Sequence, residues 1–438
     1  MNMLTSTIRL KHILFGYRKS SFVKNVFVIM SGSVIAQSIG FVLTPIISRL
    51  FSPHDFGIFG SFNSLFTIIA AGATLEYSQA IMLPREKEDA FNLFFLSCVC
   101  TYAVGILCLM ICLFIPALVN SVMKTDGVWA LVLLVVSTVV AGINQSCQAW
   151  CTRVKAFKQI SSAQVIRSFS ANGTQIGFGY LNGGATALII SNVLANIFAI
   201  MSVINVILSD LLTLRSNISW NRMKQLARDY VDFPMYSCSQ NVINALSAGL
   251  PVLLLTYFYG IVVAGAYTFG VRILWTPMSL VVGALRQVLL QKAGEIQHQG
   301  GSLLPLYVKI SSGLFILALF PSVVLFIWAP DIFRWLFGSQ WHMAGEFVRS
   351  IVLWLMFAFC NLPAVLFARF IRIQRTVFLY DLLLLAARMS ALVLGGLYLN
   401  VFQTIMLFSL VGAVMNVFLI LLVGRALIKN KVALPGII

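Results

Sequence analysis

Twelve apolar runs, each about as long as a membrane-crossing helix, fill most of this 438-residue chain. A bilayer core about 30 Å thick needs roughly 20 apolar residues per helix. The runs lie near residues 25–48, 57–83, 91–119, 128–150, 163–181, 184–209, 234–258, 264–290, 306–329, 345–368, 376–399 and 401–427. Hydrophobic residues make up 60% of the chain and charged residues 10%, which excludes a soluble globular domain. The sequence therefore predicts an all-α integral membrane protein of about twelve transmembrane helices.

The longest break between these runs divides the chain into two halves of six. We expect a basic N-terminal segment at 1–24, a six-helix lobe at 25–209, a linker at 210–233, a second six-helix lobe at 234–427 and a tail at 428–438. The apolar stretch after the basic segment is longer than a signal-peptide core and lacks a small-residue cleavage pattern. We therefore expect it to be retained as the first helix.

Lysine and arginine are distributed unequally between alternate loops. The side that carries the N-terminus holds 22 of them, whereas the other side holds only Arg49, Lys124 and Arg334. Because cytoplasmic loops of membrane proteins are enriched in these residues, both termini and the linker are predicted to be cytoplasmic. Topology and attraction to anionic headgroups account for most of the net charge of +17, so no nucleic-acid partner is expected.

The two halves resemble each other in sequence. SIGFVLTPIISRLFSPHDFGIFG aligns with LSAGLPVLLLTYFYGIVVAGAYTFG when Pro45 is set on Pro251 and Gly57 on Gly265. An even number of helices in each half makes this a parallel repeat, related by an axis along the membrane normal. Such repeats in transporters enclose a central site, so a cavity between the two lobes is predicted.

Five arginines fall inside the predicted helices, namely Arg167, Arg272, Arg286, Arg349 and Arg388. A charge in a bilayer is costly and normally faces a protein interior or a watery cavity. Arg272 and Arg388 lie deepest, so we expect them to line the cavity, with structural ion pairing as the alternative. The other three lie near helix ends, where the side chain can also extend to the interface.

Two acids accompany these arginines, Glu76 in the second helix and Asp381 in the eleventh. Asp381 and Arg388 are seven positions apart, so they share a helix face and could form a neutralising pair. The alternative for either acid is a role in coupling transport to protons or cations.

The first helix of each half carries polar residues at helical spacing. They are Ser33, Gln37, Thr44 and Ser48 in one half, and Ser237, Gln240, Asn244 and Ser247 in the other. Gln37 and Asn244 correspond under the repeat. Such residues either hydrogen-bond between membrane helices or line a hydrated cavity that binds sugar hydroxyls, and both interpretations stay open.

Catalytic and cofactor motifs are absent from the sequence. It has no GxxxxGK[ST] phosphate loop and no HExxH, and no loop is long enough to hold a soluble catalytic site. The eight cysteines fall in apolar segments without metal-ligand spacing, which indicates packing rather than a metal site. We therefore expect a protein that is not an enzyme and binds no metal or cofactor.

Six segments together resemble a known family. They are LTPIISRLFSPHDFGIFG, LEYSQAIMLPREKEDAFNLFFLS, QAWCTRVKAFKQISSAQVIRS, DFPMYSCSQNVINALSAGLPVLLL, AGAYTFGVRILWTPMSLVVGALRQVLLQKAGE and WLFGSQWHMAGEFVR. In this order they resemble the polysaccharide-unit (O-antigen, Wzx-type) flippases of the multidrug/oligosaccharidyl-lipid/polysaccharide (MOP) exporter superfamily. None of the segments is a catalytic signature, so their joint occurrence makes the resemblance specific.

The resemblance implies two lobes around a cationic cavity that opens alternately to each side of the bacterial inner membrane. It implies a polyprenyl-diphosphate-linked oligosaccharide as substrate and membrane lipid as surroundings, with a polysaccharide polymerase and chain-length proteins as further partners. Arginine suits such a substrate because its planar fork binds oxyanions with two hydrogen bonds.

Several residues match the family's segments. The resemblance implies substrate roles for Arg49 in SRLFSPHDFG, Arg153 in WCTR and Arg272 in YTFGVRI, and it supports the placement of Arg167. Asp381 and Arg388 lie outside the matching segments, so their roles are inferred from charge and depth alone.

Three other classes of protein compete with the flippase. A multidrug exporter of the same superfamily would share the fold but is expected to have an acid-rich cavity, against which five intrahelical arginines and two acids argue. A membrane enzyme such as a polymerase would need a large outer loop. A structural membrane protein would leave the buried charges unexplained.

Overall fold

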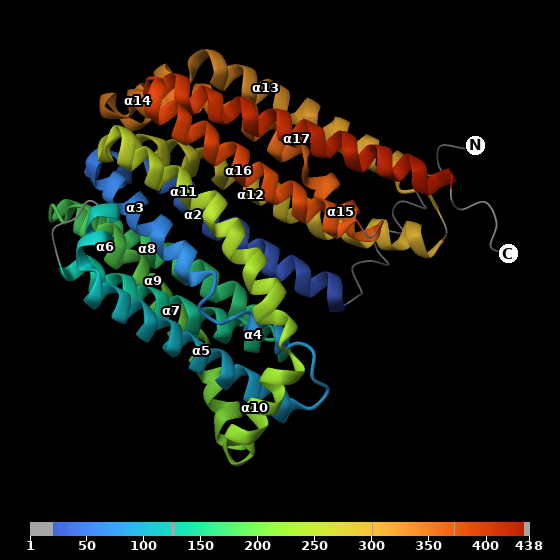
Figure 1. The fold of residues 1–438 in the computed structure, drawn as a ribbon. Helices are drawn as coiled ribbons and strands as arrows, with labels where there is room; N and C mark the ends of the chain where they lie inside the picture. Colours follow the sequence, from blue (N-terminus) through green and yellow to red (C-terminus); the bar gives the residue numbers. More distant parts are fainter. Residues whose placement is uncertain (1–20, 124–127, 300, 372, 433–438) are drawn as a thin grey trace, which may run out of the picture.

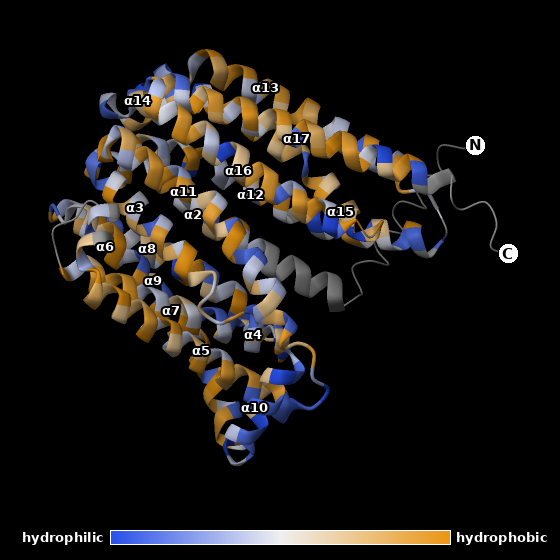
Figure 2. Ribbon diagram, viewed as in Figure 1, coloured by the Kyte–Doolittle hydropathy of each residue, from blue (hydrophilic) through white to orange (hydrophobic). Residues whose placement is uncertain are grey.

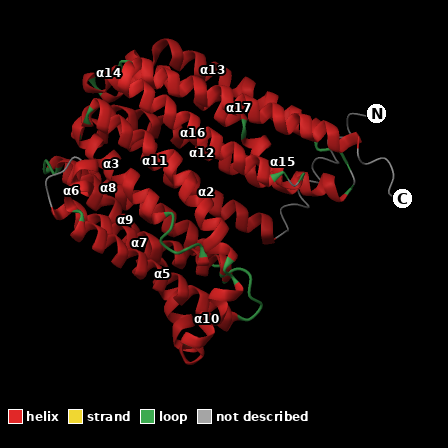
Figure 3. Cartoon of the chain, viewed as in Figure 1, coloured by secondary structure: helices red, strands yellow, loops and turns green. Residues whose placement is uncertain are grey.

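The computed structural model describes residues 21–123, 128–299, 301–371 and 373–432, and every regular element within them is a helix (Figure 3). The first lobe contains α2 (Ser21–Leu50), α3 (Pro53–Ala70), α4 (Tyr77–Ala80), α5 (Lys87–Phe114), α6 (Pro116–Met123), α7 (Val128–Arg153), α8 (Phe157–Tyr180) and α9 (Gly184–Leu214). Most of the predicted N-terminal segment 1–24 and part of the tail 428–438 lie outside the described residues.

The linker and the second lobe follow. A short turn of helix, η1 (Arg215–Asn217), precedes α10 (Trp220–Asp229), and a π-helical segment, η2 (Phe233–Cys238), leads into the second lobe. That lobe contains α11 (Ser239–Tyr259), α12 (Ile261–His298), α13 (Leu304–Phe337), η3 (Ser339–Trp341), α14 (His342–Cys360), α15 (Leu362–Phe370), α16 (Gln374–Tyr398) and α17 (Val401–Val432). Part of the predicted linker is therefore helical.

The all-helical, multi-pass architecture predicted from the sequence is confirmed. Ten helical stretches in the described part of the chain are long and apolar enough to cross a membrane. Two expected spans, α3 and α8, are helical but less apolar, because α3 begins with His54 and Asp55 and α8 carries many Ser, Gln, Asn and Thr residues. The count of twelve crossings remains a prediction.

The run at 57–83 does not form the single helix that its apolar character predicts. It divides into α3 and α4, separated by turns over residues 71–76. Leu75 and Glu76 adopt left-handed backbone conformations, with φ of 46° and 61°. Such values are uncommon outside glycine and interrupt a right-handed helix. The break therefore depends on tertiary structure that the apolar pattern does not report.

Two further runs are divided at prolines. The run at 91–119 is interrupted between α5 and α6, where Pro116 is the first residue of the new helix. The run at 345–368 is interrupted between α14 and α15 at Asn361, two residues before Pro363. Proline lacks the backbone N–H that would continue the preceding helix, which explains both interruptions.

The two lobes join at one end of the molecule and diverge toward the other (Figure 1). At the joined end, which we call the closed end, α3 packs against α11 and α12, and α2 packs against α12 and α13. One apolar core there contains residues of both lobes, whereas each lobe has a core of its own toward the open end. Apolar residues cover the outer faces of α5, α13 and α17, and polar residues gather at α10 (Figure 2).

Aromatic rings and two glycines hold the closed end together. The rings of Phe269 and Trp341 stack with centroids 3.9 Å apart, and Phe56 meets both edge-on. Gly57 and Gly265 are the fifth residues of α3 and α12, as the repeat predicts. A Cβ on Gly265 would lie 1.8 Å from the Pro53 carbonyl oxygen, and one on Gly57 would lie 2.0 Å from that of Ile261. The two helices therefore approach so closely that only glycine fits.

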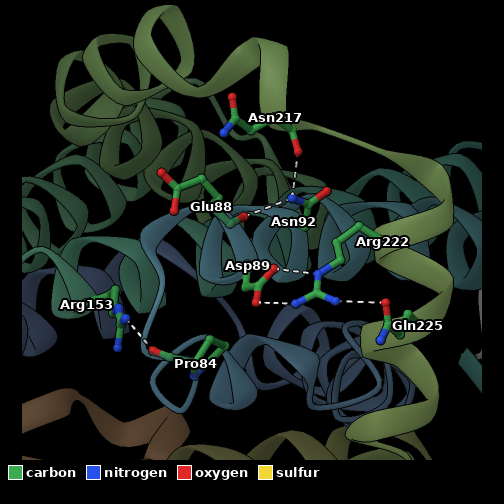
Figure 4. Close-up of polar contacts among 8 residues, drawn as sticks. All are labelled: Pro84, Glu88, Asp89, Asn92, Arg153, Asn217, Arg222 and Gln225. Carbon is green, nitrogen blue, oxygen red and sulfur yellow. Dashed lines mark hydrogen bonds and ion pairs between the residues drawn. The ribbon is translucent and has the colours of Figure 1, made fainter.

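Polar contacts fasten the linker helix α10 to the start of α5 (Figure 4). Arg222 donates from Nε and Nη2 to the two carboxylate oxygens of Asp89, at 2.7 and 2.6 Å. Asn92 donates to the carbonyl oxygens of Glu88 and Asn217 and accepts from the backbone N–H of Ser219. These bonds explain why the linker is ordered against the first lobe.

Candidate functional site

A cavity of about 730 Å³ lies between the two lobes. The first lobe contributes residues of α3, α8 and α9, and the second contributes residues of α11, α12, α14 and α16. Five of the residues singled out from the sequence line this one cavity, namely Asn244, Ser247, Arg272, Asp381 and Arg388. Charge within the apolar runs therefore selected three residues that the fold brings together.

Arg388 lies on α16 with only 6% of its surface exposed. Its Cζ is 4.0 Å from the ring centroids of both Trp354 and Phe408, whose planes are inclined at 69°, so the guanidinium lies in the corner formed by the two rings. This cation–π arrangement fixes the planar group without using its N–H donors. The Nε atom is buried without a hydrogen-bond partner. Arg388 therefore keeps donors for a ligand.

The neutralising pair between Asp381 and Arg388 does not form. Among the described residues, the ion pairs join Lys87 to Asp210, Arg222 to Asp89 and Arg349 to Glu346. Asp381 instead accepts a long hydrogen bond of 3.4 Å from Gln240 Nε2. Although seven residues along a helix place two side chains on one face, the contact of the Arg388 guanidinium with the rings of Trp354 and Phe408 holds it away from the carboxylate.

Arg272 lies on α12 and is half-buried in the wall of the cavity. No carboxylate among the described residues lies within ion-pair distance of it. Trp275 follows one turn later, with 52% of its surface exposed. The described wall thus presents two guanidinium groups and a single carboxylate, Asp381.

Several amide side chains on the cavity wall were not predicted. Asn63 comes from α3, Asn172 and Gln175 from α8, and Asn192 from α9. The signal in the sequence that could have revealed the α8 residues is the low apolarity of that segment. Gln37, by contrast, is not among the cavity residues, because its Oε1 accepts a hydrogen bond of 2.9 Å from the Ser279 hydroxyl of α12. Gln37 therefore joins helices of different lobes, although its counterpart Asn244 lines the cavity.

Three of the predicted substrate arginines lie away from the cavity. Arg49 lines a second hollow of about 560 Å³ near the closed end, with Tyr180 and Trp335. Arg153 donates to the carbonyl oxygens of Met82, Pro84 and Arg85, so it holds the loop between α4 and α5. Figure 4 shows the bond to Pro84. Arg167 is exposed on α8 and is not part of the cavity wall.

Glu76 lies in the break between α3 and α4, with 2% of its surface exposed. Its carboxylate accepts a hydrogen bond of 2.8 Å from Asn241 Nδ2 on α11, and a second from Gln79 Nε2. No cation among the described residues lies within ion-pair distance of Glu76. A buried acid thus links the first lobe to the second through neutral partners.

Within the described ranges, no three His, Cys, Asp or Glu side chains gather as a metal site. All eight cysteines are free thiols, and six of them are buried. The polar groups that the wall of the central cavity offers a ligand are therefore its charged side chains, amides and hydroxyls.

The fold is that of known membrane transporters. The lipid II flippase MurJ in an inward closed conformation gives a TM-score of 0.71 at 13% identity, over 91% of this chain and 90% of that one. An inward-facing multidrug resistance MATE family transporter of the MOP superfamily gives 0.67 at 15% identity, over 92% and 100%. A MOP superfamily transporter from Pyrococcus furiosus, described as having a binding pocket of reverse polarity, gives 0.62 at 16% identity, over 93% and 96%. The chain thus shares with these transporters a fold of two helical lobes around a central cavity.

The chain belongs to the polysaccharide biosynthesis protein family, whose sequence pattern matches residues 46–346. This range contains Arg49, Arg153, Arg167 and Arg272, whereas Asp381 and Arg388 lie beyond it. No curated protein matches the chain in sequence.

Proposed function

We propose that this protein is a flippase that moves polyprenyl-diphosphate-linked oligosaccharides across the bacterial inner membrane. Arg272 and Arg388 hold the diphosphate in the central cavity, and the polyprenyl chain stays in the lipid. The observation that carries this proposal is the pair of guanidinium groups without carboxylate partners on one cavity wall. The family that the chain belongs to supports a role in polysaccharide biosynthesis.

The electrostatics of the cavity favour an anionic ligand. A charge out of water is costly unless an opposite charge accompanies it. A diphosphate would compensate Arg272 and Arg388 and offer oxygens to the planar forks of both side chains. The cavity volume of about 730 Å³ also suits a head group of a few sugars, since small-molecule sites span about 300–1,000 Å³.

The conformation suits loading from the cytoplasm. The charge bias of the loops assigns the ends of α2 and α13 near Arg49 and Arg334 to the outside, and the lobes are joined at that end. The structure then corresponds to an inward-open state. Alternating access would open the joined end and bring the diverging ends together.

A multidrug exporter of the same fold is the alternative function. Asp381 on the cavity wall favours it, because a carboxylate can attract a cationic drug. Two arginines oppose that single acid, so the net charge of the described wall favours the flippase.

Energy coupling is assigned to the two acids. Glu76 is the stronger candidate because it is buried, has neutral partners and connects the two lobes. Asp381 is the second candidate, and its hydrogen bond with Gln240 is long. A polysaccharide polymerase and chain-length proteins are the expected partners downstream, for O-antigen, capsule or exopolysaccharide assembly.

Reconstitution tests the proposed function. Liposomes containing the purified protein are loaded with lipid-linked oligosaccharide from the source bacterium, and its appearance on the opposite leaflet is followed with an impermeant glycan-oxidising reagent. We expect transfer that depends on the protein and is lost in Arg272→Ala. Absence of transfer, together with efflux of the cation ethidium, would establish the exporter instead.

A further inference from the structure

The two walls of the central cavity differ in chemistry. All the charged residues on its described wall, Arg272, Asp381 and Arg388, belong to the second lobe. Among the described residues, the first lobe contributes no charged side chain to the cavity, but it contributes four amides and two hydroxyls. These polar residues are Asn63, Ser64, Thr67, Asn172, Gln175 and Asn192. We propose that the four amides form a glycan subsite that selects the oligosaccharide, separate from the anion subsite of the second lobe. This inference rests on the proposed function, and it identifies the wall of the cavity that recognises the sugars.

Two pairs of buried amides hold helices together within the lobes. Asn144 Nδ2 donates to Asn196 Oδ1 at 2.9 Å in the first lobe, and Asn361 Nδ2 donates to Asn416 Oδ1 at 2.8 Å in the second. No such pairing joins the four amides of the cavity wall to one another or to other side-chain amides. Asn361 Oδ1 is itself buried without a donor, so the difference lies in the partners: among the described residues, no side-chain hydrogen bond of the cavity amides reaches another helix.

Atoms of the cavity amides lack hydrogen-bond partners. Asn172 Nδ2 donates to the Ser168 carbonyl oxygen at 2.7 Å, which fixes the orientation of that amide. Its Oδ1 and the Oε1 of Gln175 are buried without a donor. Asn63 is exposed on the wall, and its side chain makes no hydrogen bond within the described residues. Asn192 uses only its Nδ2, which donates to the Leu188 carbonyl oxygen of its own helix.

These unused groups suit a sugar. An amide both donates and accepts, as hydroxyl and acetamido groups of a sugar also do. A ligand that lacks the matching hydroxyl leaves the polar groups of such a site without a hydrogen-bond partner, so the site discriminates strongly against it. A diphosphate, which only accepts, cannot pair with the amide oxygens of Asn63 and Asn192, which are the more exposed amides of this wall. The second lobe offers the opposite chemistry, since Arg388 Nε is a donor without an acceptor.

A ligand that uses both subsites must bridge the two lobes. The oligosaccharide contacts α3, α8 and α9, while the diphosphate contacts α12 and α16. Only a substrate with both parts then draws the diverging lobes together. This arrangement would prevent transport of a polyprenyl diphosphate that has not received its sugars.

Binding measurements on the full chain in lipid nanodiscs test the subsite. Native mass spectrometry is used with two probes, the lipid-linked oligosaccharide pool extracted from the source bacterium and polyprenyl diphosphate without sugar. We expect the wild-type protein to bind the glycosylated probe more tightly. Asn63→Ala and Asn192→Ala should each weaken that binding by about tenfold, the effect of losing one good hydrogen bond, and leave binding of the bare diphosphate unchanged.

Control variants separate the two proposals. Arg272→Ala should weaken the binding of both probes. Gln374→Ala, which removes an exposed amide outside the cavity, should change the binding of neither probe. Two results would overturn the glycan subsite without contradicting the flippase. One is equal affinity of the wild-type protein for the two probes, and the other is an equal loss of affinity for both probes in the amide variants. Failure of the wild-type protein to bind either probe would overturn the flippase, and the subsite with it.

Discussion

The indole Nε1 of Trp341 donates a hydrogen bond of 2.8 Å to the Ser48 carbonyl oxygen, across the boundary between the lobes. Ser48 lies in the last turn of α2, where carbonyl groups have no partner within their own helix. Gln340 Nε2 donates to the same oxygen at 2.7 Å. The end of the first helix is therefore capped by the opposite lobe, so opening of the closed end must break both bonds.

We expect Trp341→Phe to favour opening of the closed end. Phenylalanine keeps an aromatic ring against Phe269 but removes the donor to Ser48. Loss of one hydrogen bond of about 1 kcal/mol should shift the ratio of closed to open molecules about fivefold. Distances between spin labels at the closed end, near the start of α3 and the end of α13, would measure this shift. Trp328→Phe, at an exposed position of α13, should leave the distances unchanged.

We expect Gly265→Ala to block closure of the same end. The added methyl group would overlap the Pro53 carbonyl oxygen, which belongs to the backbone and cannot move aside as a side chain does. The variant should be inserted normally, since alanine is a better helix former than glycine. Transport should nevertheless fall at least tenfold, because the two lobes can no longer meet at the closed end. Gly283→Ala lies on the same helix with open space around it, so it is the matched control. Normal transport by Gly265→Ala would contradict the role of this contact.

The sequence predicted the cavity residues whose burial is costly. A charge deep in an apolar run needs a polar environment wherever the helix packs, and this local argument found Arg272, Asp381 and Arg388. Neutral residues carry no comparable signal. Gln37 and Asn244 occupy corresponding positions in the repeat, yet one bonds to Ser279 and the other lines the cavity. Which of these occurs depends on the neighbouring helix, which the sequence does not report.

Motif resemblance and local geometry also diverge. Arg153 belongs to a segment typical of the family, but its guanidinium holds the carbonyl groups of Met82, Pro84 and Arg85. A motif shows which residue type occurs at a position. It does not show whether that residue binds substrate or positions a loop. The break at Leu75 and Glu76 was missed for a related reason, because neither residue type favours a left-handed conformation.

We expect Glu76→Gln to abolish the response of transport to an imposed proton gradient while preserving protein abundance. The glutamine carbonyl can still accept the hydrogen bond from Asn241, but the side chain can no longer bind and release a proton. Initial transfer rates in liposomes would be compared across a series of pH differences. Glu86→Gln, at an exposed loop position, is the control. Identical gradient dependence in Glu76→Gln and the wild-type protein would remove Glu76 from the coupling mechanism.

Reporter fusions test the orientation on which the inward-open assignment depends. Fusions within 84–90, 151–162, 210–233 and 369–375 should report the cytoplasm, because these segments carry most of the loop arginine and lysine. Fusions within 121–127 and 330–343 should report the outside. The second of these is best placed at Gly338, since α13 continues to Phe337. A single reproducible inversion would require a different number of crossings.

The role of Arg388 can be separated from that of a structural ion pair. Arg388→Met keeps much of the side-chain volume between Trp354 and Phe408 but removes the charge and every donor. Because Asp381 is not paired with Arg388, this change leaves no newly isolated carboxylate, and membrane insertion should remain near normal. Export should fall by at least tenfold, while Arg388→Lys should retain part of it, since lysine keeps the charge but lacks the planar fork.

The double variant Arg388→Met with Asp381→Asn completes this test. If Arg388 binds the diphosphate, removing the acid cannot replace the lost donors, so export should stay low at normal protein abundance. If the two residues neutralise each other in another state of the transport cycle, Arg388→Met alone should lower abundance by leaving the acid uncompensated. Asp381→Asn would then restore both abundance and export. Protein level and surface polysaccharide, scored separately in the same cells, distinguish these results, and recovery of both would exclude Arg388 as a ligand of the substrate.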